Sequence, residues 1–518
     1  MLAITRTAAL SGIEGINVKV EVDSARGLPA FNIIGLGDTA VKEAADRVKS
    51  AVTNSGLEYP RGRVTVNLSP AWVRKKGSHY DLPMAVGVLI TQKIISQESV
   101  SGKAFVGELA LTGEVRGVKG VLPMINGLIK SSSETEKINE IFFSDENYRE
   151  GFLAARGMNV KITAIKTLTQ LISILKGEEA GSQCDDSFFG KAENSMAPEL
   201  DFSEVRGHWA AKEAIVTAVA GNHVILMIGP PGTGKTMLAK RIPTILPEMS
   251  PMEQLETSMI YSLMGMLSSG HPVIEKRPFR QINRRITPAQ MMGGGNEPLP
   301  GEISMANNGI LFVDEFLEFD RAQIELLRKP LEEQQIRLIR RGNAYTFPAK
   351  FMLVGAANPC RCGYLGDDNH NCTCSRTEID KYRSRLSGPL CERIDMCIEV
   401  SRIDYKSLVG ETSESSEEMK QRVELARQKQ RERFCGTNIV VNSQMEESHL
   451  KQFCLLGKKE KEFMKKAYSR YNLSPRRYHK ILKLARTSAD IQGAENIELH
   501  HLAAALNYTR FFNTYEKE

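Results

Sequence analysis

A glycine-rich segment at residues 229–236, reading GPPGTGKT, constrains this chain more than any other feature of its sequence. It fits the spacing G-x-x-x-x-G-K-[ST] and lies between an apolar run at 224–228 and a helix-forming run at 237–240. Glycines let backbone N–H groups close around phosphates, the lysine neutralises the β- and γ-oxygens, and the threonine hydroxyl binds Mg²⁺. A chance glycine-rich turn is the alternative, which the flanking runs disfavour. The predicted nucleotide-binding residues are Gly229, Pro230, Pro231, Gly232, Thr233, Gly234, Lys235 and Thr236.

A second apolar run, 310–313, ends in two carboxylates, Asp314 and Glu315. We expect Asp314 to hold Mg²⁺ through its water shell and Glu315 to polarise the attacking water as general base. Paired acids at a strand end could instead cap the next helix. Asp320 with Gln323 already makes a capping box for that helix, so the pair at 314 and 315 is free for chemistry.

A third apolar run, 351–354, leads to Asn358. An amide beside the γ-phosphate can orient the lytic water without competing as a base. The alternative is that Asn358 and the proline after it form an ordinary turn. Together the three runs predict a site that uses ATP and Mg²⁺ as cofactors and hydrolyses ATP.

Length and composition set wider bounds. A chain of 518 residues is expected to hold three or four domains. A net charge of +6 permits a nucleic-acid partner without demonstrating one. No apolar run approaches the ~20 residues that span a bilayer, and the first residues lack the pattern of a signal peptide. Nine cysteines, four of them clustered, argue against a disulfide framework, so we expect a cytoplasmic protein without a membrane partner.

Patterning divides the chain into four segments. Residues 1–176 show short alternating strands with Gly and Pro between them, which is typical of a compact α+β domain. A polar stretch, 177–201, is expected to be a linker. Residues 202–404 alternate helix with continuous apolar strands, which favours an α/β domain with a buried parallel sheet. The remainder, 405–518, has charged and apolar residues at helical spacing and predicts a helical domain.

These motifs, in this number and order, resemble the magnesium-chelatase-like branch of the AAA+ ATPases, usually called YifB or ComM. The resemblance covers nearly the whole chain. It is carried by GLPAF at 27–31, VNLSP at 66–70, DLPMA at 81–85, PGEIS at 300–304, LSGPL at 386–390, RID at 393–395 and SPR at 474–476.

The resemblance implies roles that spacing does not provide. Asn358 would be the first sensor. Arg393 would be the arginine finger that reaches into a neighbouring subunit's site, and Arg476 would be the second sensor, contacting the γ-phosphate from the C-terminal helical lid of its own chain. A site completed by a neighbour implies a ring, most plausibly a hexamer. Arg393 could instead form a salt bridge to Asp395 or a local helix contact, and Arg477 leaves the lid assignment uncertain by one position.

The N-terminal domain resembles the Lon-type protease fold. That fold's nucleophile position falls at His79 and its lysine position near Leu122. An apolar Leu122 cannot activate a nucleophile, and the nearby Ser78 has no evident lysine partner, although Lys119 is close in sequence. The resemblance therefore implies a non-proteolytic domain that serves oligomerisation or partner binding.

Two stretches depart from the family pattern: 281–285 reads QINRR, and an Asn pair occupies 307–308, where histidines are expected. Both are expected to lie in the insertion that lines the pore of the ring.

Four cysteines follow Asn358 as two C-x-C pairs, Cys360, Cys362, Cys372 and Cys374. Two thiolate pairs on a short loop could close a tetrahedral zinc site, with His370 as a substitute ligand. Four free thiols on a loop is the alternative.

Residues 336–341 and 344–347 predict a hairpin around a turn at Gly342-Asn343. Related ring motors push such a hairpin into the central pore, where Arg340 and Arg341 would meet phosphates and Tyr345 could offer a stacking face. A solvated hairpin without a partner is the alternative.

The leading hypothesis is a DNA motor that binds single-stranded or branched DNA and drives branch migration, as the resemblance implies. The alternatives are a protein-remodelling or chelatase-type ATPase, and a scaffold whose assembly ATP switches. The chain lacks the integrin-like module expected of larger chelatase subunits, which weakens the chelatase version.

Overall fold

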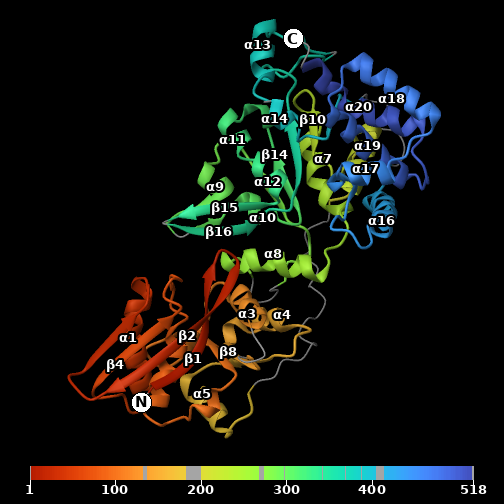
Figure 1. Ribbon diagram of the computed structural model, residues 1–518. Helices are drawn as coiled ribbons and strands as arrows, with labels where there is room; N and C mark the ends of the chain where they lie inside the picture. Colours follow the sequence, from red (N-terminus) through yellow and green to blue (C-terminus); the bar gives the residue numbers. More distant parts are fainter. Residues whose placement is uncertain are drawn as a thin grey trace.

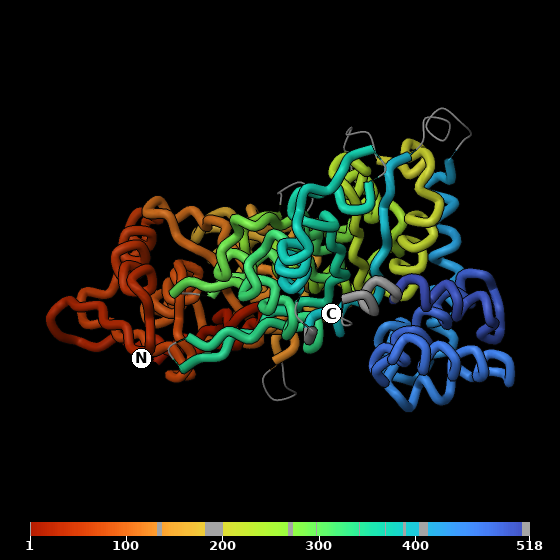
Figure 2. The backbone as a smooth tube through the Cα atoms, turned by 90° about the horizontal axis from the view of Figure 1, so that it is seen from above, coloured from red at the N-terminus to blue at the C-terminus, as the bar shows by residue number. Residues whose placement is uncertain are grey.

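The computed structural model describes residues 2–131, 137–181, 200–267, 273–296, 298–340, 342–367, 369–386, 388–403 and 413–515. An α+β part built from the first 181 residues lies below a central part with a parallel sheet, and a helical part flanks the central one (Figure 1). Seen from above, the three parts follow one another along the molecule (Figure 2). Much of the predicted linker and the boundary at 404/405 lie outside the described residues.

The described residues of the N-terminal part form two larger sheets and a two-stranded one, β6 with β7. The first has the order β1-β2-β4-β3, antiparallel except for the β3–β4 pair. Alternate residues of β2, Val18, Val20 and Val22, are fully buried, which confirms the predicted alternation. The second sheet is parallel, in the order β5-β8-β9. The elements are β1 (Leu2–Ser11), β2 (Glu14–Ala25), β3 (Ala30–Ile34), α1 (Thr39–Asn54), β4 (Arg63–Ser69), α2 (Asp81–Thr91), β5 (Lys103–Val106), β6 (Glu108–Leu109), β7 (Val115–Arg116), α3 (Val121–Lys130), β8 (Glu140–Ser144), α4 (Tyr148–Ala155), β9 (Lys161–Ile165) and α5 (Leu168–Lys176).

The central part contains a five-stranded sheet in the order β11-β14-β17-β10-β18, in which every neighbouring pair is parallel. All four residues of β10 and of β14 are buried, as continuous apolar runs predict. Strand β17 extends three residues past the predicted end at 354, because the small residues that follow still pair with β10. The strands are β10 (Ile225–Ile228), β11 (Phe279–Ile282), β14 (Ile310–Val313), β17 (Met352–Ala357) and β18 (Met396–Glu399).

Helices cover this sheet, and a separate hairpin, β15 with β16, projects from it (Figure 1). The further elements of the central part are α6 (Trp209–Gly221), α7 (Lys235–Arg241), α8 (Pro251–Leu263), α9 (Pro288–Met292), β12 (Gly293–Gly294), β13 (Leu299–Pro300), α10 (Glu302–Met305), α11 (Arg321–Glu325), α12 (Arg328–Glu333), β15 (Gln335–Arg340), β16 (Asn343–Pro348), α13 (Arg376–Arg383) and α14 (Gly388–Cys391).

The C-terminal part is helical, as predicted. Its apolar side chains, such as Val423 and Ile481, belong to the same buried cluster as residues of α6 and β10. Its helices are α16 (Ser416–Arg433), α17 (Glu447–Phe453), α18 (Lys458–Tyr471), α19 (Pro475–Ile491) and α20 (Leu499–Tyr515). Among the helices that the structure describes, none has the length and apolar character needed to cross a bilayer.

Helix α8 joins the central part to the N-terminal part. Met259 of α8 belongs to the buried cluster around α3 and β8, and Asn126 of α3 donates to its sulfur at 3.4 Å. The backbone N–H of Gly120 also donates to the carbonyl of Ser262 at 3.2 Å. These contacts brace the sheet that carries the glycine-rich loop against the N-terminal part.

Candidate nucleotide site

The glycine-rich loop connects the end of β10 to the start of α7. Gly232 and Gly234 have φ of +79° and +83°, in the left-handed region that side chains with a Cβ rarely adopt. A Cβ on Gly229 would lie 2.1 Å from the carbonyl oxygen of Val400. These glycines therefore shape a loop whose backbone turns tightly into the N-terminus of a helix, which is an anion-binding arrangement.

Lys235 is the first residue of α7 and folds back over the loop. Its ammonium group donates to the carbonyl oxygens of Gly229 and Pro230, at 2.6 and 2.8 Å, and to Oδ1 of Asn358 at 3.4 Å. Burial lowers the pKa of Lys235 to about 8, and the charge of Asp314 opposes that shift. The cation is thus held where it would meet phosphate oxygens, beside the amide predicted to be the first sensor.

Thr236, the second residue of α7, lies beside Asp314, which directly follows β14. The Thr236 hydroxyl donates to Oδ2 of Asp314 at 3.3 Å. A hydroxyl and a carboxylate oxygen are ligand types that Mg²⁺ accepts, so these residues fit the ion predicted for them. Asp314 also accepts from the backbone N–H of Glu315 at 3.0 Å and from the side chain of Gln281 at 3.5 Å.

The two stretches that depart from the family pattern differ in exposure, and the predicted place of 281–285 at a pore stays a prediction. Gln281 lies on β11, which pairs with β14 inside the central sheet. Asn307 and Asn308 are buried and donate to Glu256 of α8, each at 3.0 Å. Asn307 and Asn308 therefore belong to the core, where their amides satisfy buried partners, and do not line a pore, whereas Gln281 is exposed.

Glu315 is exposed and has a left-handed backbone, with φ of +52°. The capping residue Asp320 donates its own backbone N–H to the side chain of Gln323 at 3.1 Å, as the capping box predicts. The carboxylate of Glu315 therefore has no capping task at that helix.

The four-cysteine loop begins directly after Asn358 and packs against the phosphate loop. A Cβ on Gly363 would lie 2.8 Å from the ring of Pro231. The sulfur atoms of Cys360, Cys362, Cys372 and Cys374 all lie within 4.8 Å of one another. Three of their separations are 3.3, 3.5 and 3.7 Å. Zn–S bonds of about 2.3 Å in a tetrahedron place sulfur atoms about 3.8 Å apart, so the donor set fits Zn²⁺.

His370 does not join this set. Its ring stacks on Tyr364 at 4.8 Å and lies 3.8 Å from the carboxylate of Asp367. Burial disfavours the thiolate of Cys362, but hydrogen bonds from the backbone N–H groups of Tyr364 and Thr373 outweigh it and lower its pKa.

The two arginines implied by the resemblance are paired with carboxylates outside the phosphate loop. Arg393 forms an ion pair with Glu332 of α12, and the exposed Arg476 forms one with Glu392. Burial and the neighbouring charge of Arg476 lower the pKa of Arg393. The expected alternative partner of Arg393, Asp395, is engaged elsewhere.

Asp395 links the sheet to the helical part. Burial disfavours its carboxylate, but His223 and Lys480 of α19 hold its pKa well below the ordinary value. Arg477, the neighbour of Arg476, is largely buried at the start of α19.

The hairpin is present, but Asn343 is not part of its turn as predicted. Asn343 pairs with Arg340 and is the first residue of β16. Arg340 is exposed, and Arg341 lies outside the described residues. Tyr345 is wrongly predicted as a stacking face: its ring is largely buried, and the Lys76 ammonium lies 5.8 Å from its centre.

The residues at the Lon-like positions are packed or paired. His79 is buried and lies 2.8 Å from the carbonyl oxygen of Ala8, and Leu122 is fully buried. The Ser78 hydroxyl donates to Glu108. Lys119 packs on Gly265, after α8. None of these contacts joins a serine to a lysine.

Sequence reasoning missed residues on the other side of the phosphate loop. His208 has a left-handed backbone, and a Cβ on Gly234 would lie 3.7 Å from its ring. The next residue, Trp209, is exposed at the start of α6. A tryptophan is rare in this chain, and this one could have drawn attention to the edge beside the phosphate loop.

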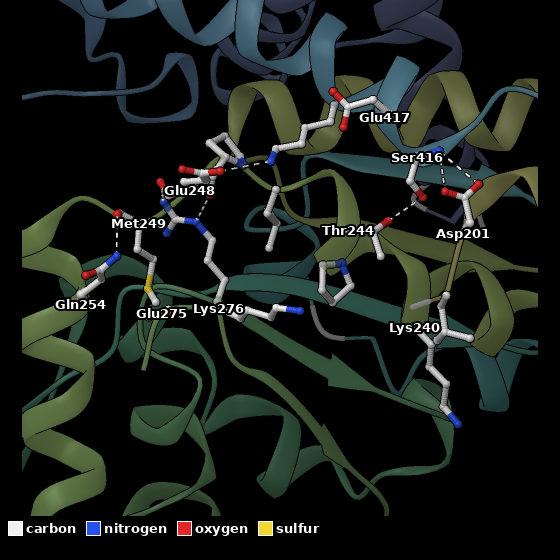
Figure 3. Close-up of a pocket in the computed structure, with 16 residues that line it drawn as sticks. Asp201, Lys240, Thr244, Glu248, Met249, Gln254, Glu275, Lys276, Ser416 and Glu417 are labelled. Carbon is white, nitrogen blue, oxygen red and sulfur yellow. Dashed lines mark hydrogen bonds and ion pairs between the residues drawn. The ribbon is translucent and has the colours of Figure 1, made fainter. Parts of the chain in front are cut away.

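A cavity of about 700 Å³ lies where α7, the start of α8 and the start of α16 meet (Figure 3). Some of its lining groups are engaged with each other: Lys420 pairs with Glu248 at 3.5 Å, and the backbone N–H of Ser416 donates to Asp201 at 3.3 Å. Residues 229–236 are not among those that line it. This cavity belongs to the junction between the sheet and the helical part.

Comparisons with known proteins agree with this geometry. Family models described as magnesium chelatase subunit ChlI match residues 20–146 and 201–408, and a model of the C-terminal part of that subunit matches 413–509. The chain is 39% identical over 520 residues to the competence protein ComM of Haemophilus influenzae, covering 100% of this chain and 99% of that protein. It is 37% identical over 510 residues to the protein YifB of Escherichia coli, covering 98% and 97%. A shorter match, 28% identical over 179 residues, links it to the magnesium-chelatase 38 kDa subunit of Rhodobacter capsulatus, covering 31% of this chain and 51% of that subunit.

Proposed function

This chain belongs to the magnesium-chelatase-like AAA+ family, in the branch that includes ComM and YifB, and on that premise we propose that it is an ATP-hydrolysing ring motor that acts on DNA. One observation carries the ATPase part of the proposal. Lys235, held by Gly229 and Pro230, also donates to Asn358, while Thr236 donates to Asp314. A cation, a magnesium ligand pair and a polar amide thus converge on one loop.

The residues divide the work of hydrolysis. ATP with Mg²⁺ supplies the reactive phosphoanhydride, and residues 229–236 bind its phosphates through backbone N–H groups and Lys235. Thr236 and Asp314 hold the ion, Glu315 accepts the proton of the attacking water, and Asn358 orients that water. Arg393 stabilises the developing charge from a neighbouring subunit, and Arg476 does so from the lid of its own chain.

A site completed in trans requires a closed ring, and we propose a hexamer in the cytoplasm. The chain would be divided as 1–176, the linker 177–201, the ATPase core 202–404 and the lid 405–518. The N-terminal domain would be a Lon-like domain without protease activity, because Ser78 donates to Glu108 while Leu122 is buried. The loop of Cys360, Cys362, Cys372 and Cys374 would hold one structural Zn²⁺.

The DNA part of the proposal rests on the hairpin. Arg337 and Arg340 are exposed on it, and no acidic residue lies between 337 and 347 to neutralise them. Six copies around one axis would make a positive collar that holds a phosphate backbone without reading bases. The name of the Haemophilus relative, a competence protein, is consistent with a DNA substrate.

The test measures the ATPase rate of the wild type with and without single-stranded or forked DNA, together with DNA affinity by fluorescence anisotropy at several salt concentrations. We expect DNA to raise the ATPase rate. Arg340→Ala/Arg341→Ala should lower DNA affinity and flatten its salt dependence, by about 0.7 in slope for each lost phosphate contact to a single strand. Lys458→Ala/Lys459→Ala, which removes the same charge from exposed positions of α18, should leave both unchanged. A wild type that hydrolyses ATP but binds no DNA at low salt would favour a protein substrate.

A further inference from the structure

The loop between β4 and α2 exposes a tryptophan. Trp72 is 71% exposed, although tryptophan is among the largest apolar side chains, and the chain has only two. A single exposed apolar residue needs no explanation, but an aromatic ring kept in solvent on a held loop is a typical feature of stacking platforms.

The loop is held from within. Lys75 is fully buried; its ammonium group donates to the carbonyl of Pro70, and its backbone N–H donates to the carbonyl of Leu36 at 2.9 Å. The N–H of Val73 also donates to the carbonyl of Pro70, at 3.3 Å. Trp72 is therefore presented by a backbone with internal hydrogen bonds, which reduces the entropy that a ligand would have to remove.

The loop that carries the ring is basic. Residues 71–77 read AWVRKKG and contain no acid. Arg74 forms no ion pair with any residue that the structure describes. The carboxylate of Asp38 contacts the end of this loop. It accepts hydrogen bonds from the backbone N–H groups of Val41 and Gly77, at 2.9 and 3.2 Å.

The same loop lies beside the basic hairpin. The Lys76 ammonium is 5.8 Å from the ring centre of Tyr345 on β16. A second contact supports this placement, because a Cβ on Gly12, between β1 and β2, would lie 2.7 Å from the carbonyl oxygen of Thr346. Tyr345 pairs with Leu338, and Arg340 lies two residues further along β15, so Arg340 shares the hairpin face that Lys76 covers. Figure 1 shows the hairpin directly above the N-terminal part.

We propose that loop 70–77 and the hairpin form one binding surface for single-stranded nucleic acid, in which Trp72 stacks on bases while Arg74, Lys76 and Arg340 hold phosphates. Four residues span at most about 14 Å, so the ring and the Lys76 charge lie within reach of a few consecutive nucleotides. Stacking is independent of base identity, so the surface takes single strands of any sequence. The proposal rests on the DNA motor proposed above and adds the N-terminal part to its DNA path.

The test uses the full chain with a non-hydrolysable ATP analogue and single-stranded oligothymidylate. Anisotropy reports affinity, and intrinsic tryptophan fluorescence reports stacking. We expect binding to quench the wild-type fluorescence and expect Trp72→Phe to lose that quenching while it keeps most of the affinity, because phenylalanine also stacks. Trp72→Ala should bind about tenfold more weakly. Arg74→Gln should reduce the salt slope by about 0.7.

Leu111→Ala is the matched control, because Leu111 is also apolar and exposed in the N-terminal part but lies on the turn between β6 and β7. It should bind as the wild type does. The inference is overturned if the wild type binds DNA while Trp72→Ala and Arg74→Gln match it, or if Trp72→Ala instead breaks ring assembly, which would make the ring a protein contact. A wild type that binds no single-stranded DNA would instead overturn the proposal that the protein is a DNA motor, and the two failures can thus be told apart.

Discussion

Lys235 is a cation that the fold keeps partly out of water. Burial lowers its pKa to about 8, and the carbonyls of Gly229 and Pro230 hold the ammonium group. A phosphate would favour the charged form and raise the pKa again. The free protein therefore loses this proton as the pH rises through about 8, whereas the ATP complex keeps it.

ATP affinity should consequently fall above pH 8, by up to about tenfold for each further pH unit until the pKa of the complex is reached. Isothermal titration of ATP between pH 7 and 9.5 measures this, in a range where the phosphates are already fully ionised. Lys235→Arg is the control, because a guanidinium stays protonated throughout and should give a flat profile. A wild-type profile as flat as that of the arginine variant would contradict the assigned cause.

At the scale of elements, the four-cysteine loop connects the sensor strand to the region of Arg393. It leaves the sheet directly after Asn358, and Gly363 packs on Pro231. The structure of this loop therefore helps to position both the Asn358 amide and the phosphate loop. Four sulfur atoms within 4.8 Å leave room for one tetrahedral ion.

Purified protein should carry about one zinc per chain by elemental analysis. Cys362→Ser/Cys374→Ser should remove the metal and expose the loop to limited proteolysis, because ligand binding supplies part of the folding free energy of such loops. Cys435→Ser, at an exposed cysteine of the helical part, should retain the zinc. Metal-free wild type with a protease-resistant loop and full ATPase activity would retire the site.

Elements that depend on a short run of neighbouring residues could be predicted from the sequence. The runs at β10 and β14 are apolar throughout because helices cover both faces, and the capping residues Asp320 and Gln323 lie three positions apart. The hairpin was placed correctly, but its turn was not, because Asn343, predicted as a turn residue, already pairs with Arg340. Burial of Tyr345 depends on Lys76, some 270 residues away, and no local pattern reports such a contact.

The same limit applies to the site. The phosphate loop and the pair Asp314 and Glu315 are continuous motifs that follow β10 and β14. These parallel strands lie on either side of β17, so both motifs come to the same edge of one sheet. The contact of Gln281 with Asp314 was not foreseen, because residues 281–285 stood out only as a departure from the family pattern in the insertion expected to line the pore. The carboxylates of Glu332 and Glu392 were not anticipated, because side-chain pairing across elements is decided by packing.

At the scale of the whole molecule, those carboxylates matter because they hold the two arginines within one subunit. Arg393 pairs with Glu332, and Arg476 pairs with Glu392. The pair formed by the exposed Arg476 is of a kind that contributes about 0–1 kcal/mol, so a nucleotide phosphate can displace it at little cost. Arg393 is only partly exposed, so its release from Glu332 has to be offset by its new contacts at a neighbour's site. Assembly of a ring would then transfer Arg393 from Glu332 to the site of a neighbour.

Complementation between two inactive variants tests this transfer. Lys235→Ala disables the phosphate loop of its own subunit but leaves an intact Arg393, and Arg393→Ala does the reverse. In an equal random mixture, about a quarter of the interfaces in a closed ring join an intact loop to an intact finger. The mixture should therefore regain a fraction of the wild-type ATPase rate that neither variant shows alone. Affinity capture of one tagged variant with the other checks that the subunits mix. Arg393→Lys tests whether a positive charge alone supports hydrolysis, since lysine cannot form the bidentate contacts of a guanidinium. Mixed rings that stay inactive at every ratio would place Arg393 in its own subunit's chemistry or in structure alone.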